Sequence, residues 1–202
     1  TAIINNHPKA RPQSGLSQAD VVYEVLAEGN VTRFLAVYQS EVPERIGPIR
    51  SARDYFVQLA EGLDSIHILH GYSPDAKTLL DDGYVDHLNG LFHDGTLFNR
   101  DASRKAPHNS YTTYEQIIEG AKEQGYKLTG SPKAWPFLSK EEAAAIEGEE
   151  GRKATVLYGD ADFDVVYTYS EEDGKYGRTV KDEPAVDAET GQEIMLDNII
   201  IM

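Results

Sequence analysis

Three arginines, Arg45, Arg50 and Arg53, lie directly before the segment with the clearest helical pattern in the chain. A guanidinium group is planar, stays charged and can donate paired hydrogen bonds to carboxylate or phosphate oxygens, even where it is partly buried. The first turn of a helix carries free N–H groups and the positive end of the helix dipole, so cations there need a compensating anion. The cluster therefore predicts that this region holds an anionic group.

Arginine is also distributed unevenly along the chain. Residues 1–104 contain seven arginines and two lysines, whereas residues 105–202 contain two arginines and eight lysines. Lysine suits a solvated surface, so this bias indicates that the first half is built around fixed anionic partners. The candidate ligand-binding residues are Arg11, Arg33, Arg45, Arg50, Ser51, Arg53 and Asn109. The alternative is an internal ion network in which Glu24, Glu44 and Asp54 neutralise the arginines.

Two histidines occupy positions suited to acid–base chemistry. His70 follows a predicted strand, where α/β folds place groups that face a ligand, and His108 lies in a loop beside Pro107. With Glu24 or Asp54 as a second carboxyl group, either imidazole could serve in a cell-wall hydrolase. Gly-x-Ser-x-Gly, Ser-x-x-Lys and His-Glu-x-x-His motifs are absent. The alternative is histidines with ordinary structural hydrogen bonds, and enzymatic activity is left open.

The sequence predicts no metal site and no cofactor. The His–Asp pairs at 86–87 and 93–94 match no specific metal-ligand spacing. The acids at 160, 162, 164 and 171 imitate a calcium-binding loop, but Val165 stands where that loop needs glycine. The chain has no cysteine, which excludes disulfides, zinc–thiolate sites and thiol nucleophiles.

Charge and composition narrow the classes of partner. The chain has 202 residues and a formal net charge of -15, which repels nucleic acid and anionic lipid head groups. With 40% hydrophobic and 26% charged residues, the composition is that of a folded globular protein. No apolar run approaches the roughly 18 residues that cross a bilayer. The chain begins at Thr1 and stops in the apolar run before Met202, and we interpret both ends as processing or truncation boundaries.

The elements expected in the first part form an α/β or α+β fold with a mixed sheet and packed helices. Strands are predicted at 2–6 and 65–71, with a hairpin at 21–27 and 31–38, of which the first run has a helix as its alternative. Helices are predicted at 55–62, capped by Ser51, at 73–80, and from Thr112 or Thr113 onward. Residues 83–107 have little periodicity and many turn-forming residues, so we expect a long functional loop there.

The second part is expected to be a smaller antiparallel β unit. Alternating patterns predict strands at 154–158, 164–169 and 175–180, and the apolar run at 198–201 predicts a final strand. The predicted organisation is a main domain at 1–138, an acidic linker or short helix at 139–153, and a β unit at 154–202 that is truncated.

Several segments together resemble the YerB-like lipoprotein family. They are Asn6-His7-Pro8-Lys9-Ala10-Arg11-Pro12-Gln13-Ser14-Gly15-Leu16, Val22-Tyr23-Glu24, Thr32-Arg33-Phe34-Leu35-Ala36, Ile46-Gly47-Pro48-Ile49-Arg50-Ser51-Ala52-Arg53, and, in the second part, Tyr176-Gly177-Arg178, Asp187-Ala188-Glu189-Thr190-Gly191 and Asn198-Ile199-Ile200. The resemblance thus covers most of the chain. It implies a bacterial, extracytoplasmic protein held at the cell membrane by a lipidated cysteine ahead of a flexible spacer, and it implies no biochemical activity.

The first hypothesis is therefore a binding module whose arginines hold an anionic cell-envelope polymer, a peptide or a partner protein. Its membrane contact would be the lipid anchor alone. The second hypothesis is the hydrolase described above, and a structural spacer is a third. Arginines on an open surface favour the binding module, whereas carboxylates that converge in a deep cleft favour the hydrolase.

Overall fold

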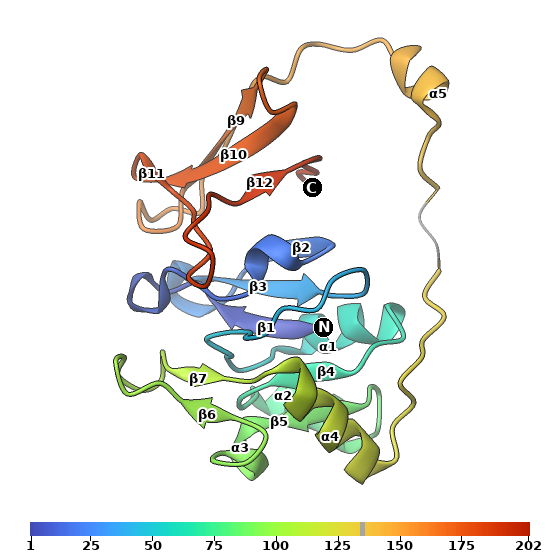
Figure 1. The fold of residues 1–202 in the computed structure, drawn as a ribbon, viewed down its shortest axis with the longest axis vertical. Coiled ribbons are helices and arrows are strands. Elements are labelled where there is room, and N and C mark those ends of the chain that lie inside the picture. The colour runs from blue at the N-terminus through green and yellow to red at the C-terminus, as the bar shows by residue number, and fades with distance from the viewer. Residues whose placement is uncertain (134–135) are drawn as a thin grey trace.

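The computed structural model describes residues 1–133 and 136–202. It contains two five-stranded sheets and a two-stranded ribbon. Helices α1 to α4 lie with the first large sheet, and α5 lies apart from it, in the connection to the second sheet (Figure 1). The strands and helices are β1 (Ala2–Asn5), β2 (Val21–Leu26), β3 (Thr32–Val37), α1 (Asp54–Gly62), β4 (His67–Leu69), α2 (Pro74–Asp81), β5 (His87–Asn89), α3 (Gly90–His93), β6 (Asn99–Arg100), β7 (Ser110–Tyr111), α4 (Tyr114–Gln124), α5 (Lys140–Ala144), β8 (Lys153–Val156), β9 (Val165–Ser170), β10 (Lys175–Val180), β11 (Glu183–Pro184) and β12 (Met195–Leu196). Short 3₁₀ turns lie at Pro8–Ala10, Leu16–Gln18 and Glu28–Asn30.

The first sheet is mixed, with the order β2-β3-β1-β4-β5. β2 and β3 form the predicted antiparallel hairpin, and β3 is also antiparallel to β1. β1, β4 and β5 are parallel to one another, so their carboxyl ends lie at the same edge. The predicted fold class, a mixed sheet with helices and a separate antiparallel sheet, is confirmed.

Alternation along the strands gives the first sheet two buried faces. Ile3 and Ile4, neighbours in β1, are both fully buried but belong to different core clusters. On the Ile3 face, α1 and α2 contribute the core residues Phe56, Val57, Ala60, Ala76 and Leu80. On the Ile4 face, the cluster includes Phe34, Ile68, Leu88 and Ile194, with Ile117 of α4 packed against it. This face is therefore partly covered by Ile194, which directly precedes β12 of the second sheet.

The helix after the arginine cluster forms as predicted, but Ser51 does not cap it. α1 begins at Asp54, its N-cap residue is Arg53, and no side chain caps it. Ser51 instead donates a 3.0 Å hydrogen bond to the backbone oxygen of His70. The reason is that residues 49–52 run as an extended segment beside β4, so Ser51 lies too far from the first turn to cap it.

This extended segment separates two parallel strands. β1 and β4 pair only at Ala2 and Ile68. Beyond that point, Arg50 donates its backbone N–H to the oxygen of Ile3 at 2.9 Å and accepts one from His70 at 3.0 Å. Arg50 is therefore inserted between the carboxyl ends of β1 and β4, which is where ligands commonly bind in open α/β sheets.

The prediction of a continuous loop at 83–107 is wrong, because β5, α3 and β6 lie within it. Its three-residue strand, β5, is too short to produce a visible alternation. Asn89 then starts α3, since its side-chain oxygen accepts from the backbone N–H of Leu91 at 3.0 Å. The turn-forming residues thus mark junctions between short elements.

The second sheet is antiparallel, with β8, β9, β10 and β11 in line and β12 also paired with β10. The predicted final strand at 198–201 does not form. Tyr176 pairs with Leu196 and β10 begins at Lys175, so in this register the residues after Asp197 extend past the start of β10 and have no strand residue opposite them. Ile200 and Ile201 are exposed. In the described residues, no helix is long and apolar enough to span a bilayer.

Candidate functional site

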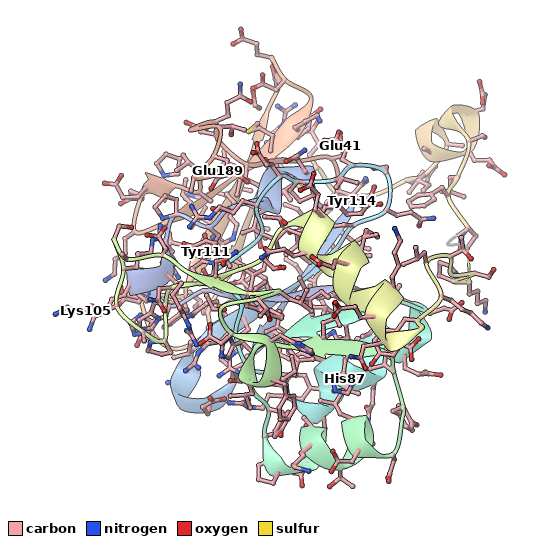
Figure 2. The ribbon with its side chains drawn as sticks, turned by 60° about the horizontal axis from the view of Figure 1, so that its bottom comes forward. Glu41, His87, Lys105, Tyr111, Tyr114 and Glu189 are labelled. Atoms are coloured by element: carbon pink, nitrogen blue, oxygen red, sulfur yellow. The ribbon has the colours of Figure 1, made fainter. Side chains whose placement is uncertain are left out.

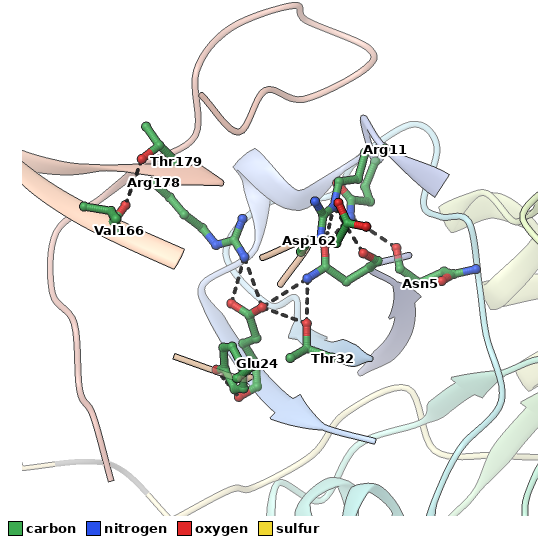
Figure 3. A network of polar contacts seen from close by, with 11 residues as sticks. Asn5, Arg11, Glu24, Thr32, Asp162, Val166, Arg178 and Thr179 are labelled. Carbon is green, nitrogen blue, oxygen red and sulfur yellow. Dashed lines mark hydrogen bonds and ion pairs between the residues drawn. The ribbon is translucent and has the colours of Figure 1, made fainter. Parts of the chain in front are cut away.

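Glu24, a candidate catalytic acid, holds the two sheets together (Figure 3). Both its carboxylate oxygens accept from the same guanidinium nitrogen of Arg178 in β10, at 3.0 and 2.9 Å. Thr32 and Asn6 donate to it as well, at 2.8 and 3.0 Å. Only 7% of its side chain and 9% of that of Arg178 are exposed. The Glu24 side chain is thus buried and accepts hydrogen bonds from three residues.

Arg178 is a residue that the sequence analysis did not single out. Although burial opposes its charge, Glu24 and Tyr167 hold the pKa of Arg178 above its ordinary value. A small cavity of about 70 Å³ lies beside this pair, with apolar walls that include Phe34 and Ile194. A buried arginine needs a carboxylate partner. An arginine within a predicted strand of the short β unit was therefore the sequence signal for a partner in the first part of the chain.

Arg11 also spans the two sheets. Its Nε donates to the backbone and side-chain oxygens of Asn6, at 3.1 and 3.0 Å, and a terminal nitrogen donates to the backbone oxygen of Asp162 at 2.7 Å (Figure 3). Its guanidinium carbon lies 5.4 Å from the centre of the Phe163 ring. Burial lowers the pKa of Arg11. Its contacts brace the fold.

Arg33 and Arg53 share one carboxylate, that of Glu28. Arg33 donates to it at 2.6 Å, and Arg53 donates through Nε at 3.0 Å and through a terminal nitrogen. The Arg33 side chain is only 4% exposed, and burial lowers its pKa to about 10. The compensating acid is therefore Glu28, in the turn between β2 and β3, and not Glu24, Glu44 or Asp54.

Arg45 lies in a separate cavity of about 250 Å³. Its guanidinium group contacts Asp101 at 2.6 Å and Glu189 at 3.4 Å, and its guanidinium carbon lies 3.7 Å from the centre of the Tyr111 ring. Figure 2 labels Tyr111 of β7 and Glu189 of the second sheet's last turn. Hydrogen bonds from Ser103 and Arg45 lower the pKa of Asp101. Glu44 also lines the cavity. Arg45 is thus already paired.

Arg50 is the exception among the arginines. In the part of the chain that the structure describes, its guanidinium group has no hydrogen bond and no ion pair, whereas each of the other arginines has at least one. It is half-buried, and burial lowers its pKa. Glu28 is close enough to oppose that effect, but it is already bound by Arg33 and Arg53. Three cations thus surround one carboxylate.

His70 lies next to Arg50, but both of its ring nitrogens are occupied. A terminal nitrogen of Arg100 lies 2.9 Å from Nε2, and the Ser110 hydroxyl oxygen lies 2.8 Å from Nδ1. Because arginine can only donate, Nε2 accepts, and in the neutral ring Nδ1 carries the proton and donates to Ser110. Burial, and then Arg100, lower the pKa of His70. This imidazole cannot take the proton of Ser110 in that arrangement.

His108 stacks on His7, which the sequence analysis did not consider. The ring centres are 4.5 Å apart and the planes differ by 29°. Nδ1 of His108 lies 3.0 Å from the side-chain nitrogen of Asn5, at the carboxyl end of β1. Arg50 contributes to lowering the pKa of both rings, after burial. We call Arg50, His7, His70 and His108 the Arg50 site.

The two remaining candidates have structural surroundings. Asn109 is buried, accepts from Arg100 at 3.1 Å and donates to the backbone oxygens of Asp101 and Arg104, at 3.3 and 3.2 Å. Asp54 is the first residue of α1, where a carboxylate is favourable for the helix dipole. No group of three His, Asp or Glu side chains arranged to hold a metal ion occurs in residues 1–133 and 136–202.

The structure therefore divides the predicted site residues into three groups. Arg33, Arg50, Ser51, Arg53, His70 and His108 lie at the carboxyl edge of β1 and β4 or beside it. Arg11 and Glu24 lie between the two sheets, and Arg45 lies in the separate cavity. His7 could have been found from the sequence, since it follows a predicted strand as His70 does.

The two sheets correspond to two domain models of one family. The chain belongs to the family described as Protein of unknown function (DUF3048), since residues 1–127 match its N-terminal domain and residues 154–202 match its C-terminal domain.

Within that family, the chain is 46% identical over 202 residues to a Bacillus subtilis (strain 168) protein described as "Putative lipoprotein YerB". The match covers 99% of this chain and 60% of that protein. The crystal structure of the YerB protein from Bacillus subtilis superimposes with a TM-score of 0.87 at 45% identity, covering 96% of this chain and 64% of that chain. The resemblance inferred from the sequence is confirmed, and the chain spans less than two thirds of the length of these relatives.

Proposed function

We propose that this chain is an anion-binding domain of a cell-envelope protein and that Arg50 is its recognition residue. The observation that carries the proposal is the unpaired, half-buried guanidinium group of Arg50 at the carboxyl edge of two parallel strands. A buried or half-buried arginine normally has a carboxylate or carbonyl partner, because its desolvation is costly. A bound anion would supply that partner.

Local charge supports this proposal against the acidic background of the chain. The net charge is -15, yet the cations that act on the stacked histidines are Lys9, Arg11, Arg50 and Arg104. The acid that acts on His7 is Asp162, whose carboxylate is paired with Lys181. Arg104 donates to the backbone oxygens of Ala10 and Pro12, which leaves its charge uncompensated. A local excess of positive charge focuses anions.

The same geometry weighs against the hydrolase hypothesis. A general acid or base needs a free proton position within reach of substrate. Glu24 is buried against Arg178, and both ring nitrogens of His70 are occupied. His108 keeps a free Nε2, but neither Glu24 nor Asp54 has a hydrogen bond or ion pair with His70 or His108 among the described residues, so the predicted pair of acid and base does not form. The binding function therefore has the better structural support.

The description of the Bacillus subtilis relative as a lipoprotein supports a place for this domain outside the cell membrane, held by a lipid anchor. In that setting, the anionic ligand would be a group of an envelope polymer, a peptide or a partner protein. The expected membrane contact is the anchor alone.

The first prediction is that Arg50→Ala weakens the binding of defined anionic polymers. The probes are sodium polyphosphate and poly-glutamate, with binding to labelled protein followed by fluorescence anisotropy at low salt. Loss of a hydrogen-bonded charge corresponds to about a tenfold loss of affinity or more. Arg152→Ala is the matched control, because Arg152 is exposed and paired with Glu150 and Glu171.

Thermal melting accompanies the binding measurement, and the Arg50→Ala protein should melt like the parent. Equal binding by Arg50→Ala and the parent protein would overturn the proposal. A large loss of stability without any effect on binding would instead support the internal ion network.

A further inference from the structure

The stacked pair His7–His108 allows the chemistry of the anion to be deduced, on the basis of the function proposed above. Its key residue is Asn5, which lies at the end of β1 and is 2% exposed. The side-chain oxygen of Asn5 accepts the backbone N–H of His7 at 3.0 Å. The amide orientation is therefore fixed, and the Asn5 nitrogen is the atom that faces His108.

The orientation of Asn5 determines the tautomer of His108. The amide nitrogen of Asn5 can only donate, so Nδ1 of His108 accepts at 3.0 Å. In the neutral ring the proton is then on Nε2, which is the nitrogen that faces away from this contact. No hydrogen bond of Nε2 occurs among the described residues, and the ring is partly exposed.

His7 reaches the same state through a different contact. Its Nδ1 accepts the backbone N–H of Lys9 at 3.1 Å, in the 3₁₀ turn that follows β1. The proton of the neutral ring is therefore on Nε2 as well. Two stacked imidazoles thus each have a free N–H donor, and both lie in the electrostatic field of Arg50.

We propose that the Arg50 site binds a tetrahedral oxyanion of the phosphate type through the guanidinium group of Arg50 and the Nε2–H groups of His7 and His108. All the free groups are donors, and they come from three separate segments: the turn after β1, the extended segment at residues 49–52 and the loop before β7. Because all the free groups are donors, a cation or a metal ion would find no free acceptor nitrogen there.

A phosphate group suits this donor set better than a carboxylate does. A carboxylate offers two oxygens in one plane, which Arg50 alone can satisfy as a bidentate pair. A phosphate group offers oxygens in several directions, so donors from three segments can each reach a different one. The preferred ligand is therefore a phosphate monoester or diester group, in a polymer or a smaller molecule.

The same pair of rings makes binding depend on pH. Burial is the largest cause that lowers the pKa of each ring. For His7, Lys9 and Arg11 come next. For His108, His7 and Arg50 come next. Asp162 raises the pKa of His7 and Arg50 also lowers it, whereas Lys9 and Arg104 also lower the pKa of His108. Protonation of either ring places its second proton on Nδ1, so the ring must give up the N–H contact from Asn5 or Lys9. A bound anion favours the charged ring despite this loss, so anion binding takes up protons. Affinity should therefore increase as the pH falls from neutrality towards the lowered pKa values.

The test compares two substitutions at one position. Glutamine places an N–H donor near the position of Nε2, whereas asparagine reaches only as far as Nδ1. With polyphosphate as the probe, His108→Asn should lose about tenfold in affinity and His108→Gln should lose much less. With poly-glutamate, both variants should bind like the parent. His87→Asn is the control, because His87 lies at the start of β5, away from the carboxyl edge.

Nitrogen-15 NMR of the parent protein reads the tautomers directly, with inorganic sulfate as the titrant because its charge is constant over roughly pH 5 to 8. We expect both His7 and His108 to carry the proton of the neutral ring on Nε2. Their ring signals should shift when sulfate is added, and the shift at a given sulfate concentration should be larger at lower pH. Nδ1-protonated rings, or equal affinity of His108→Asn and His108→Gln, would overturn the inference. If Arg50→Ala still abolished polymer binding in that case, the proposed anion-binding function would stand without the histidines.

Discussion

Arg33 and Arg50 both lie close enough to Glu28 for its charge to act on them, but their contacts differ. Arg33 is 4% exposed, forms an ion pair with Glu28 and donates to the backbone oxygen of Ser51. Arg50 has no such partner in the described part of the chain and is half-buried. The internal ion network therefore describes Arg33, whereas Arg50 is the residue on which the ligand-binding proposal rests.

Unfolding experiments should separate these two roles. Arg33→Ala removes buried contacts and leaves the Ser51 oxygen unpaired, so we expect a loss of about 2 to 3 kcal/mol in the free energy of unfolding. Arg50→Ala should change it by no more than about 0.5 kcal/mol. Urea denaturation of both variants measures the difference. If Arg50→Ala were as destabilising as Arg33→Ala, Arg50 would belong to the ion network.

At the scale of elements, local chemistry made some features predictable. The hairpin β2–β3 has two runs rich in β-branched and aromatic residues joined by a short turn that contains Gly29, α2 has Ser73 before Pro74, and α4 has a capping box from Thr113 to Gln116. These signals lie within a few residues of one another, and neighbouring groups in the chain meet whatever the rest of the fold does. Such elements are readable from the sequence.

Other features depend on contacts between distant segments. The final apolar run lacks a strand partner because the β10 edge ends at Lys175, and no local pattern shows that register. Likewise, Ser51 has the residue type of a helix cap but contacts His70 across the strand insertion. The free state of Arg50 has the same origin, since it depends on Arg33 and Arg53 taking up Glu28.

For the whole molecule, a buried ion pair connects the two sheets. Glu24 of β2 and Arg178 of β10 are separated by 154 residues and are both less than a tenth exposed. Asp187 adds to the contact by accepting from the backbone N–H and the hydroxyl group of Ser17, at 3.1 and 3.0 Å. Because Arg178 is so far away in the chain, the sequence alone predicts a role for Glu24 in catalysis or as a partner of the arginine cluster, and not this pair.

Removing one partner of this pair should destabilise the contact between the sheets. Glu24→Gln leaves the Arg178 charge buried and unpaired, and we expect a loss of about 3 kcal/mol or more in the free energy of unfolding. Replacing both residues, as in Glu24→Gln with Arg178→Met, should recover part of that loss. Urea denaturation measures the free energies, and hydrogen exchange of the β10 amides locates the effect.

The exposed Arg152 pair with Glu150 provides the comparison, because surface ion pairs contribute little. A Glu24→Gln protein that is as stable as Arg152→Ala would show that the pair does not hold the sheets together. Release of soluble fragments from peptidoglycan by the parent protein, lost in Glu24→Gln, would return Glu24 to a catalytic role.

The central claim, that the unpaired Arg50 guanidinium group binds an anion, is tested most directly by crystallography with a heavy oxyanion. Crystals soaked in sodium tungstate give an anomalous signal at each bound anion. The account predicts a peak within hydrogen-bonding distance of the Arg50 guanidinium nitrogens, between the ends of β1 and β4. Peaks at Arg45 or at surface lysines, with none at Arg50, would contradict it.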